Sequence, residues 1–189
     1  MNSIYYRLVS RVIKPANGFA AASEQEMFVY GARRPGFPLP SVPQGFVDEW
    51  LAFMVDQGIQ RVVCLLPQRQ LAAYPKLLDS YHQTFGANKV CWAPINDFHF
   101  ADVPTLTELV LPFLVEAERM QEKTVVHCSG GVGRTGHVLA AWLVSFRGLS
   151  NAEAIAAVKR SGRNAQEAGR QGLDELLNAC RNHFAQASI

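Results

Sequence analysis

The sequence predicts an α/β protein of one domain, residues 1–189, with a mainly parallel central β-sheet flanked by helices. Short apolar runs rich in β-branched residues alternate along the chain with segments whose apolar residues recur at helical spacing. Strands that alternate with helices in this way pair in parallel and carry helices on both faces of the sheet. A length of 189 residues fits one domain, and no internal repeat or low-complexity segment divides it.

The predicted strands are short and bounded by glycine, proline or polar residues. Segment 61–66 is apolar almost throughout, which is typical of a strand buried on both faces. Segment 4–13 mixes arginines with β-branched and aromatic residues and is typical of an edge strand. Gly31 is expected to end the second strand. The five predicted strands are 4–13, 27–30, 61–66, 89–95 and 124–127.

The predicted helices carry apolar residues three and four positions apart. Ser41 with Gln44, and Ser150 with Glu153, resemble capping boxes that begin two of them. Pro112 falls inside a third and predicts a kink. A proline also delays the start of the second helix. The predicted helices are 43–58, 71–85, 105–120, 135–146, 150–160 and 173–184, and the predicted loops are 15–22, 33–43, 96–103 and 162–169.

Composition argues against several classes of protein. Hydrophobic residues make up 49% of the chain, and mean hydropathy is +0.01, as in an ordinary soluble protein. A net charge of +2 is too small to indicate nucleic-acid binding. No apolar run approaches the roughly 18 residues that span a bilayer, and no signal-peptide core is seen. The four cysteines form no Cys-x2-Cys zinc pattern. We therefore expect a cytoplasmic monomer without metal, cofactor, nucleic-acid or membrane partner.

The segment 125–136, Val-Val-His-Cys-Ser-Gly-Gly-Val-Gly-Arg-Thr-Gly, predicts a strand, a tight loop and a helix. Cys128 ends the strand, and three glycines let the loop turn and approach a ligand closely. Amide groups at the positive end of the helix converge on one point, which suits a tetrahedral oxyanion. The same field favours a nucleophilic thiolate at Cys128. Arg134 supplies a planar fork for two phosphate oxygens.

The pattern His-Cys-x5-Arg-Thr-Gly resembles the active-site signature of the cysteine-dependent protein tyrosine phosphatases, and the chain is closest in size to their small dual-specificity branch. The layout of residues 27–180 is similar to that family, and the specific match covers 128–136. The resemblance implies a protein tyrosine phosphatase-like fold and a phosphocysteine intermediate formed on Cys128. The phosphate would be bound by Ser129, Gly130, Gly131, Val132, Gly133 and Arg134.

The resemblance also implies an aspartate general acid on a loop before the cysteine. Asp97 ends the segment Pro-Ile-Asn-Asp, which resembles the family's Pro-Ile-Pro-Asp pattern with asparagine in place of the second proline. Asp102 is the alternative acid, although an aspartate there is also suited to cap the next helix. Thr135 would stabilise the thiolate and also begin a helix, and His127 would hold the loop by a hydrogen bond.

Three further predictions rest on looser similarity. Gln171 ends the segment that begins at Arg163, which loosely resembles one with a water-positioning glutamine in small dual-specificity phosphatases, although a solvated helix start explains it equally well. Arg33 and Arg34 are similar to a family loop near the active site, where they would contact a second phosphate or simply lie on the surface. Cys64, on a neighbouring strand, would protect Cys128 through a disulfide or be an ordinary core residue.

The favoured substrate is a phosphorylated protein or peptide carrying phosphotyrosine, with phosphoserine and phosphothreonine also considered. The variable loop positions carry no extra charge, which makes highly anionic phosphoinositides less favoured, and RNA 5′-phosphatase activity is a further alternative. The other classes are a non-catalytic phosphoprotein-binding module and a rhodanese-like sulfur carrier. The presence of Cys128, Arg134 and Asp97 together favours an enzyme over a binding module, and the Arg-Thr-Gly continuation argues against rhodanese.

Overall fold

A computed structural model describes residues 16–169 and 171–186, and these residues form a five-stranded sheet in the order β1-β2-β5-β3-β4. Strand β1 pairs antiparallel with β2, and the remaining neighbours are parallel. The mainly parallel α/β fold predicted from the sequence is therefore confirmed. The strands are β1 (Ala20–Ala21), β2 (Val29–Arg33), β3 (Ile59–Cys64), β4 (Val90–Trp92) and β5 (Lys123–Cys128).

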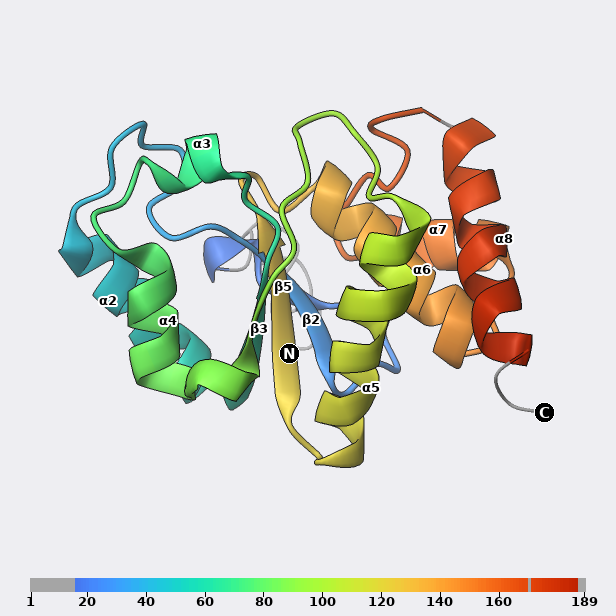
Figure 1. Cartoon of the computed structure of the whole chain (residues 1–189), viewed down its shortest axis with the longest axis horizontal. Helices are drawn as coiled ribbons and strands as arrows, with labels where there is room; N and C mark the ends of the chain where they lie inside the picture. Colours follow the sequence, from blue (N-terminus) through green and yellow to red (C-terminus); the bar gives the residue numbers. More distant parts are fainter. Residues whose placement is uncertain (1–15, 170, 187–189) are drawn as a thin grey trace, which may run out of the picture.

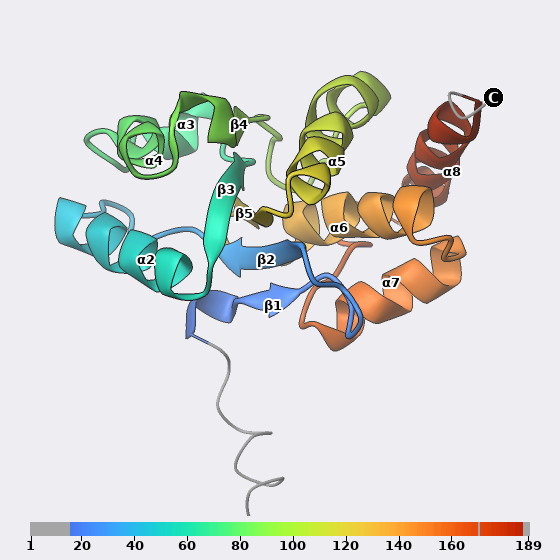
Figure 2. The same ribbon diagram turned by 90° about the horizontal axis from the view of Figure 1, so that it is seen from below.

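Helices cover both faces of this sheet (Figures 1 and 2). One face carries α2 (Gln44–Asp56), α3 (Gln68–Leu71) and α4 (Leu77–Phe85). The other carries α5 (Leu111–Arg119), α6 (Gly133–Phe146), α7 (Asn151–Arg160) and α8 (Gln171–Gln186). Short 3-10 turns occur at η1 (Ala16–Gly18) and η2 (Ala87–Lys89), and η3 (Thr105–Val110) is a π-helical segment. No helix within the described ranges is long and apolar enough to cross a membrane.

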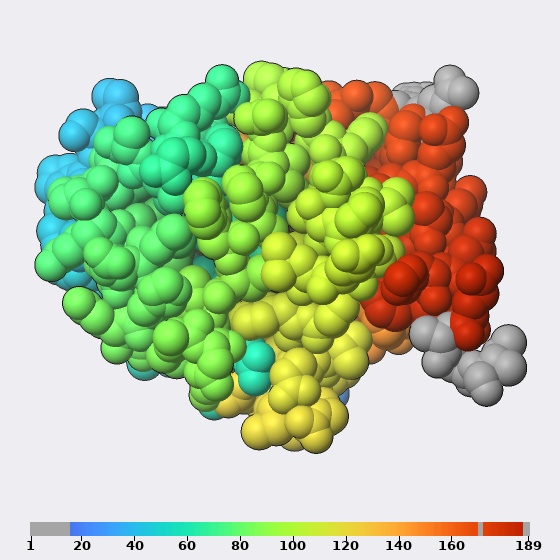
Figure 3. Space-filling view, viewed as in Figure 1, coloured from blue at the N-terminus to red at the C-terminus, as the bar shows by residue number. Residues whose placement is uncertain are grey.

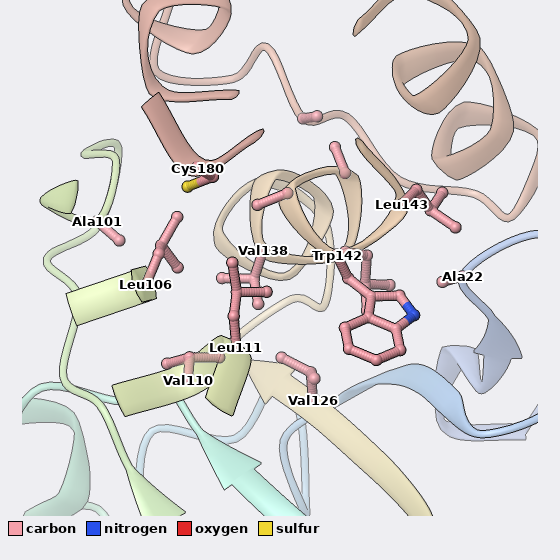
Figure 4. Close-up of a cluster of buried hydrophobic side chains, with 14 of the residues drawn as sticks. Ala22, Ala101, Leu106, Val110, Leu111, Val126, Val138, Trp142, Leu143 and Cys180 are labelled. Atoms are coloured by element: carbon pink, nitrogen blue, oxygen red, sulfur yellow. The ribbon is translucent and has the colours of Figure 1, made fainter. Parts of the chain in front are cut away.

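The core consists of two apolar clusters, one on each face of the sheet. Side chains of α6 such as Val138, Trp142 and Leu143 are completely buried and meet Val126 of β5 and Leu111 of α5 (Figure 4). This explains why the sequence of α6 is apolar nearly all round, since α7 and α8 cover the side that the sheet does not. The burial holds the first turn of α6 rigidly against β5.

Several local predictions need correction. Gly31 does not end a strand but lies within β2. Packing explains the glycine, because a Cβ there would lie 2.6 Å from the guanidinium of Arg163. Ser41 forms no capping box, since α2 begins after Pro43 and no side-chain cap bond is made. The loop predicted at 15–22 contains η1 and β1, while the strand predicted at 4–13 lies outside the described residues.

Within the predicted helix 71–85 the structure has α4 from Leu77, so the helix begins after Pro75 as predicted, and the short helix α3 ends at Leu71. Before Pro112 the chain forms the π-helical segment η3, and Pro112 occupies the first turn of α5, while the kink expected there stays a prediction. There its missing amide hydrogen costs no α-helical bond. The predicted strand 89–95 is shorter, as β4. The capping box of Ser150 and Glu153 is confirmed.

Candidate active site

The candidate site lies at one edge of the sheet, beyond the carboxyl ends of the parallel strands. Cys128 is the last residue of β5, and it pairs in register with Arg33, the last residue of β2. Asp97 follows β4 at the same edge. Helix α3, the loop after β4 and the turn before α8 gather along this edge at the top of Figures 1 and 3. Three segments distant in sequence therefore surround Cys128.

The loop from Ser129 to Val132 carries the chain from β5 directly into α6. The N-cap residue Val132 offers no side chain to accept from the first turn, so amide groups there remain available to an anion. Gly131 has φ +67°, and a Cβ on it would collide with the backbone of Ala32. The glycine thus lets the loop pack tightly against β2, and Cys128, which is 2% exposed, lies at its base.

Arg134 stands at the start of α6 with its guanidinium buried under the loop after β4. Its Nη1 donates to Gln70 Oε1 at 2.9 Å and to the carbonyl oxygen of Ile95 at 3.1 Å. Its Nη2 lies 3.0 Å from Asp97 Oδ1. Two oxygens of a phosphate could bind along the Nε–Nη2 edge only by displacing Asp97 from Nη2.

The loop of Asp97 is held against α3 and α6. Gln70 Nε2 lies 3.5 Å from Asp97 Oδ2, so the Gln70 amide touches both Arg134 and Asp97. Farther along the loop, the backbone amide of Ala101 donates to His137 Nε2 on α6. Burial lowers the pKa of His137 to about 3, which keeps its ring neutral and able to accept.

Asp102 has a different role from Asp97. Its Oδ1 accepts a hydrogen bond from the backbone amide of Thr105 at 2.7 Å, at the start of η3. Hydrogen bonding from Thr105 lowers the pKa of Asp102. This is the capping interaction that the sequence offered as the alternative explanation for an aspartate at that position. Asp102 is absent from the lining of the pocket that contains Cys128 and Asp97.

His127 is fully buried and faces away from the pocket. Its Nε2 lies 3.0 Å from the hydroxyl of Tyr81, and its Nδ1 lies 3.4 Å from the carbonyl oxygen of Cys128. Trp50 and Tyr81 pack edge-on against the ring. Burial lowers the pKa of His127 to about 4, so it is neutral near pH 7. The ring is therefore engaged by the Tyr81 hydroxyl and by the carbonyl oxygen of Cys128.

Two buried arginines hold the loop from outside. The Arg34 amide donates to the Ser129 carbonyl, and its guanidinium donates to Ser129 Oγ, to the Tyr74 hydroxyl at 2.9 Å and to the Leu39 carbonyl at 2.5 Å. Arg34 is therefore committed to protein acceptors and is not free for a second phosphate. Arg33 is half-buried, with its guanidinium 5.5 Å from the ring centroid of Phe37.

The second of these arginines, Arg163, comes from the turn after α7. Its Nη1 donates to the Gly131 carbonyl at 2.7 Å, and its Nη2 donates to the Gly18 carbonyl at 3.1 Å. Burial lowers the pKa of Arg163 to about 10, which still leaves it charged at neutral pH. Loop carbonyls that point outward accept these bonds, so the loop amides are left to face the pocket.

The pocket over Cys128 has a volume of about 200 Å³ and mixes aromatic and charged walls. Phe37 and Phe98 line it and are 41% and 69% exposed. Glu167 also lines it, and its carboxylate lies so close to Gly133 that a Cβ on this glycine would collide with it. The pocket therefore combines an anion-binding loop with two phenylalanines and an unexpected carboxylate.

The remaining predicted residues are placed as follows. The hydroxyl of Thr135 is buried and has no hydrogen-bond partner among the described residues. Gln171 begins α8, but its side chain lies outside the described part of the structure. Cys64 is on the strand next to β5, as predicted.

Cys64 and Cys128 pack in different core clusters, Cys64 with Trp50 and Tyr81 and Cys128 with Val126. Burial raises the pKa of Cys64 to about 12. A disulfide between the two cysteines stays a prediction.

The family model of the dual specificity phosphatase catalytic domain matches residues 57–171. The chain belongs to this family. It is a phosphatase domain of the cysteine-dependent protein tyrosine phosphatase superfamily, as the resemblance of its cysteine loop predicted. The matched residues include the loop of Asp97, the cysteine loop and Gln171.

Solved structures agree with this assignment. The phosphatase domain is similar to the crystal structure of Tk-PTP in the active form, with 30% identity, 83% of this chain and 93% of that chain covered and a TM-score of 0.65. The structure of kinase associated phosphatase, with its catalytic site cysteine changed to serine, has 22% identity, with 88% of this chain and 94% of that chain covered and a TM-score of 0.67. The structure of PTPMT1 in complex with PI(5)P shares the fold, with 12% sequence identity, 90% of this chain and 99% of that chain covered and a TM-score of 0.66.

Sequence reasoning missed four residues of the phosphatase site. Gln70 and Glu167 carry no motif, and Phe37 lies in a proline-rich loop that the sequence marks only as irregular. Phe98 directly follows Asp97, so its place in the sequence was a usable signal. Arg163 was identified only as the start of a loosely similar segment, and its contact with the cysteine loop depends on the packing of α7 against α6.

Proposed function

We propose that this phosphatase hydrolyses phosphate monoesters of proteins, with phosphotyrosine as its principal substrate and phosphoserine and phosphothreonine as poorer ones. The observation that carries the proposal is the pair of exposed phenylalanines, Phe37 and Phe98, that wall the pocket over Cys128. A phenyl ring held between two aromatic rings gains packing that an alkyl phosphoester cannot. Glu167 on the same pocket disfavours substrates with several phosphates, such as phosphoinositides and RNA ends.

In the proposed mechanism, phosphate oxygens bind to the loop amides and to the Nε–Nη2 edge of Arg134. The Cys128 thiolate then attacks phosphorus, and the bond from phosphorus to the leaving oxygen breaks. Asp97 takes up a proton from solvent once the phosphate has displaced its carboxylate from Arg134, and it gives that proton to the leaving oxygen. The free enzyme pairs Asp97 with Arg134, so the incoming phosphate takes over the arginine and leaves Asp97 facing the leaving group.

The second step returns the enzyme to its starting state. Water attacks the phosphorus of the phosphocysteine and gives its proton to the carboxylate of Asp97, and the sulfur–phosphorus bond breaks to release the thiolate. The hydroxyl of Thr135, without a partner in the described part of the chain, stabilises that thiolate. The described cysteines are all free, which supports a reducing cytoplasmic location.

The test compares hydrolysis of matched phosphotyrosine and phosphoserine peptides by the wild type, Phe37→Ala and Phe98→Ala. We expect each alanine variant to lower kcat/KM about tenfold for phosphotyrosine and much less for phosphoserine. Met120→Ala, at an exposed apolar position on the far end of α5, is the matched control and should change neither. Equal losses on both peptides, or faster hydrolysis of a phosphoinositide than of phosphotyrosine, would contradict the proposal.

A further inference from the structure

A second cavity, of about 550 Å³, adjoins the phosphate pocket on the side of β2. Phe37 belongs to the walls of both cavities. The two cavities lie close together because Arg33 pairs with Cys128 in the sheet and the Arg34 amide donates to the Ser129 carbonyl. The loop that follows β2 therefore lies directly against the phosphate loop, with one cavity on each side of the Phe37 ring.

Three large apolar side chains converge on this second cavity while remaining exposed. Phe37, Leu39 and Phe46 are 41%, 37% and 45% exposed, and all three line it. Gly36, at φ +63°, makes a tight turn, since a Cβ there would clash with Val42 just before α2 and would lie 3.4 Å from the Cβ of Phe46 in α2. Apolar side chains gathered at a concave site beside a catalytic pocket indicate a surface that binds a partner.

The charges of the cavity argue against a second phosphate. Arg33 lines it and lies over the Phe37 ring, but the exposed carboxylate of Glu49 lines it as well. Arg34 also contributes to the wall, yet its guanidinium donors are directed to protein oxygens. Among the described lining residues, one free cation opposed by one anion provides little net attraction for a dianion. The apolar walls therefore decide which kind of ligand fits.

We propose that this cavity binds a large apolar side chain of the substrate polypeptide, within three residues of the phosphorylated residue. The proposal rests on the function proposed above, because the occupant belongs to the same chain as the phosphate. The distance limit follows from the reach of an extended chain, about 3.3–3.6 Å per residue, across the single shared side chain Phe37. A peptide would thus place its phosphorylated residue on one side of Phe37 and the apolar residue on the other.

The test uses phosphotyrosine peptides with alanine flanks, in which phenylalanine is moved through the three positions on each side. We expect one position at which phenylalanine raises kcat/KM about five- to tenfold, chiefly through a lower KM. Glutamate and a second phosphotyrosine at that position should give a smaller gain. A larger gain from the second phosphotyrosine would instead identify a second anion site and overturn the proposal.

The matching variant is Phe46→Ala, because Phe46 lines the second cavity but not the phosphate pocket. It should abolish the gain from phenylalanine while hydrolysis of p-nitrophenyl phosphate stays unchanged, and Phe46→Leu should retain part of the gain. Leu109→Ala, with the same 45% exposure on η3, is the control and should behave as wild type. If kcat/KM does not depend on the flanking residues of the peptide while p-nitrophenyl phosphate is still hydrolysed, only this inference is overturned. Failure to hydrolyse any monoester would overturn the proposed function itself.

Discussion

Replacing Asp97 by asparagine tests the assignment of the general acid. The change keeps the shape of the side chain but removes the proton donor and the negative partner of Arg134, 3.0 Å away. The two losses act in opposite directions. Losing the acid slows departure of a basic leaving group, whereas freeing Arg134 makes it easier for a phosphate to bind.

The magnitudes decide which effect is observed. General acid catalysis contributes about 10²–10⁴-fold, equivalent to about 3–5 kcal/mol of barrier. The Asp97 side chain is 36% exposed, so its ion pair with Arg134 is worth no more than about 1 kcal/mol. We therefore expect Asp97→Asn to lower kcat strongly for phenyl phosphate and phosphotyrosine. The loss for p-nitrophenyl phosphate should be smaller, because its leaving group is a much weaker base.

The assay is the pH–rate profile with each substrate. Asp97→Asn should flatten the high-pH limb, which reports loss of the proton from the acid. Asp102→Asn is the control. It should leave both the profile and the leaving-group dependence unchanged, with at most about 1 kcal/mol of stability lost from the cap on Thr105. If Asp102→Asn flattens the limb and Asp97→Asn does not, the acid has been assigned to the wrong residue.

Three other variants probe the nucleophile, the pocket carboxylate and the buried histidine. Cys128→Ser should abolish turnover, but the variant should still bind phosphopeptide in a titration, because the anion site is built from loop amides and Arg134. Substantial residual hydrolysis would contradict the covalent mechanism. Glu167→Gln should tighten inhibition by orthovanadate about two- to fivefold, because it removes a negative charge beside the anion site. The control Glu108→Gln changes an exposed carboxylate and should leave inhibition unchanged. Weaker inhibition of Glu167→Gln would contradict the repulsion between Glu167 and the bound anion. Burial holds the pKa of His127 at about 4 in the folded protein, against about 6.5 in the unfolded chain, so the unfolded chain binds the proton first and the free energy of unfolding should fall as pH drops from 6.5 toward 4. In denaturant titrations, His127→Gln should lessen that dependence by up to about 1.4 kcal/mol per pH unit. An unchanged dependence on pH would contradict the prediction.

The sequence by itself determined the parts of this protein that depend on neighbouring residues. The strand, glycine loop and helix from Lys123 to Phe146 follow from β-branched residues, from Gly131 and from a continuous apolar run. The capping box at Ser150 is equally local. Cys128, Arg134 and the loop between them could therefore be identified from the order of the residues alone. Asp97 could be singled out as well, because it follows a strand whose end must lie at the same edge of the sheet.

Tertiary structure alone decided the features that join distant segments. Gly31 looked like the end of a strand, but it lies inside β2, where the absence of a side chain leaves room for Arg163 from the turn after α7. The bridge from Gln70 to Arg134 and Asp97 brings α3 to a loop after β4 and to the start of α6. These contacts have no sequence signal, because each depends on how the helices pack on the two faces of the sheet and not on the residues beside it.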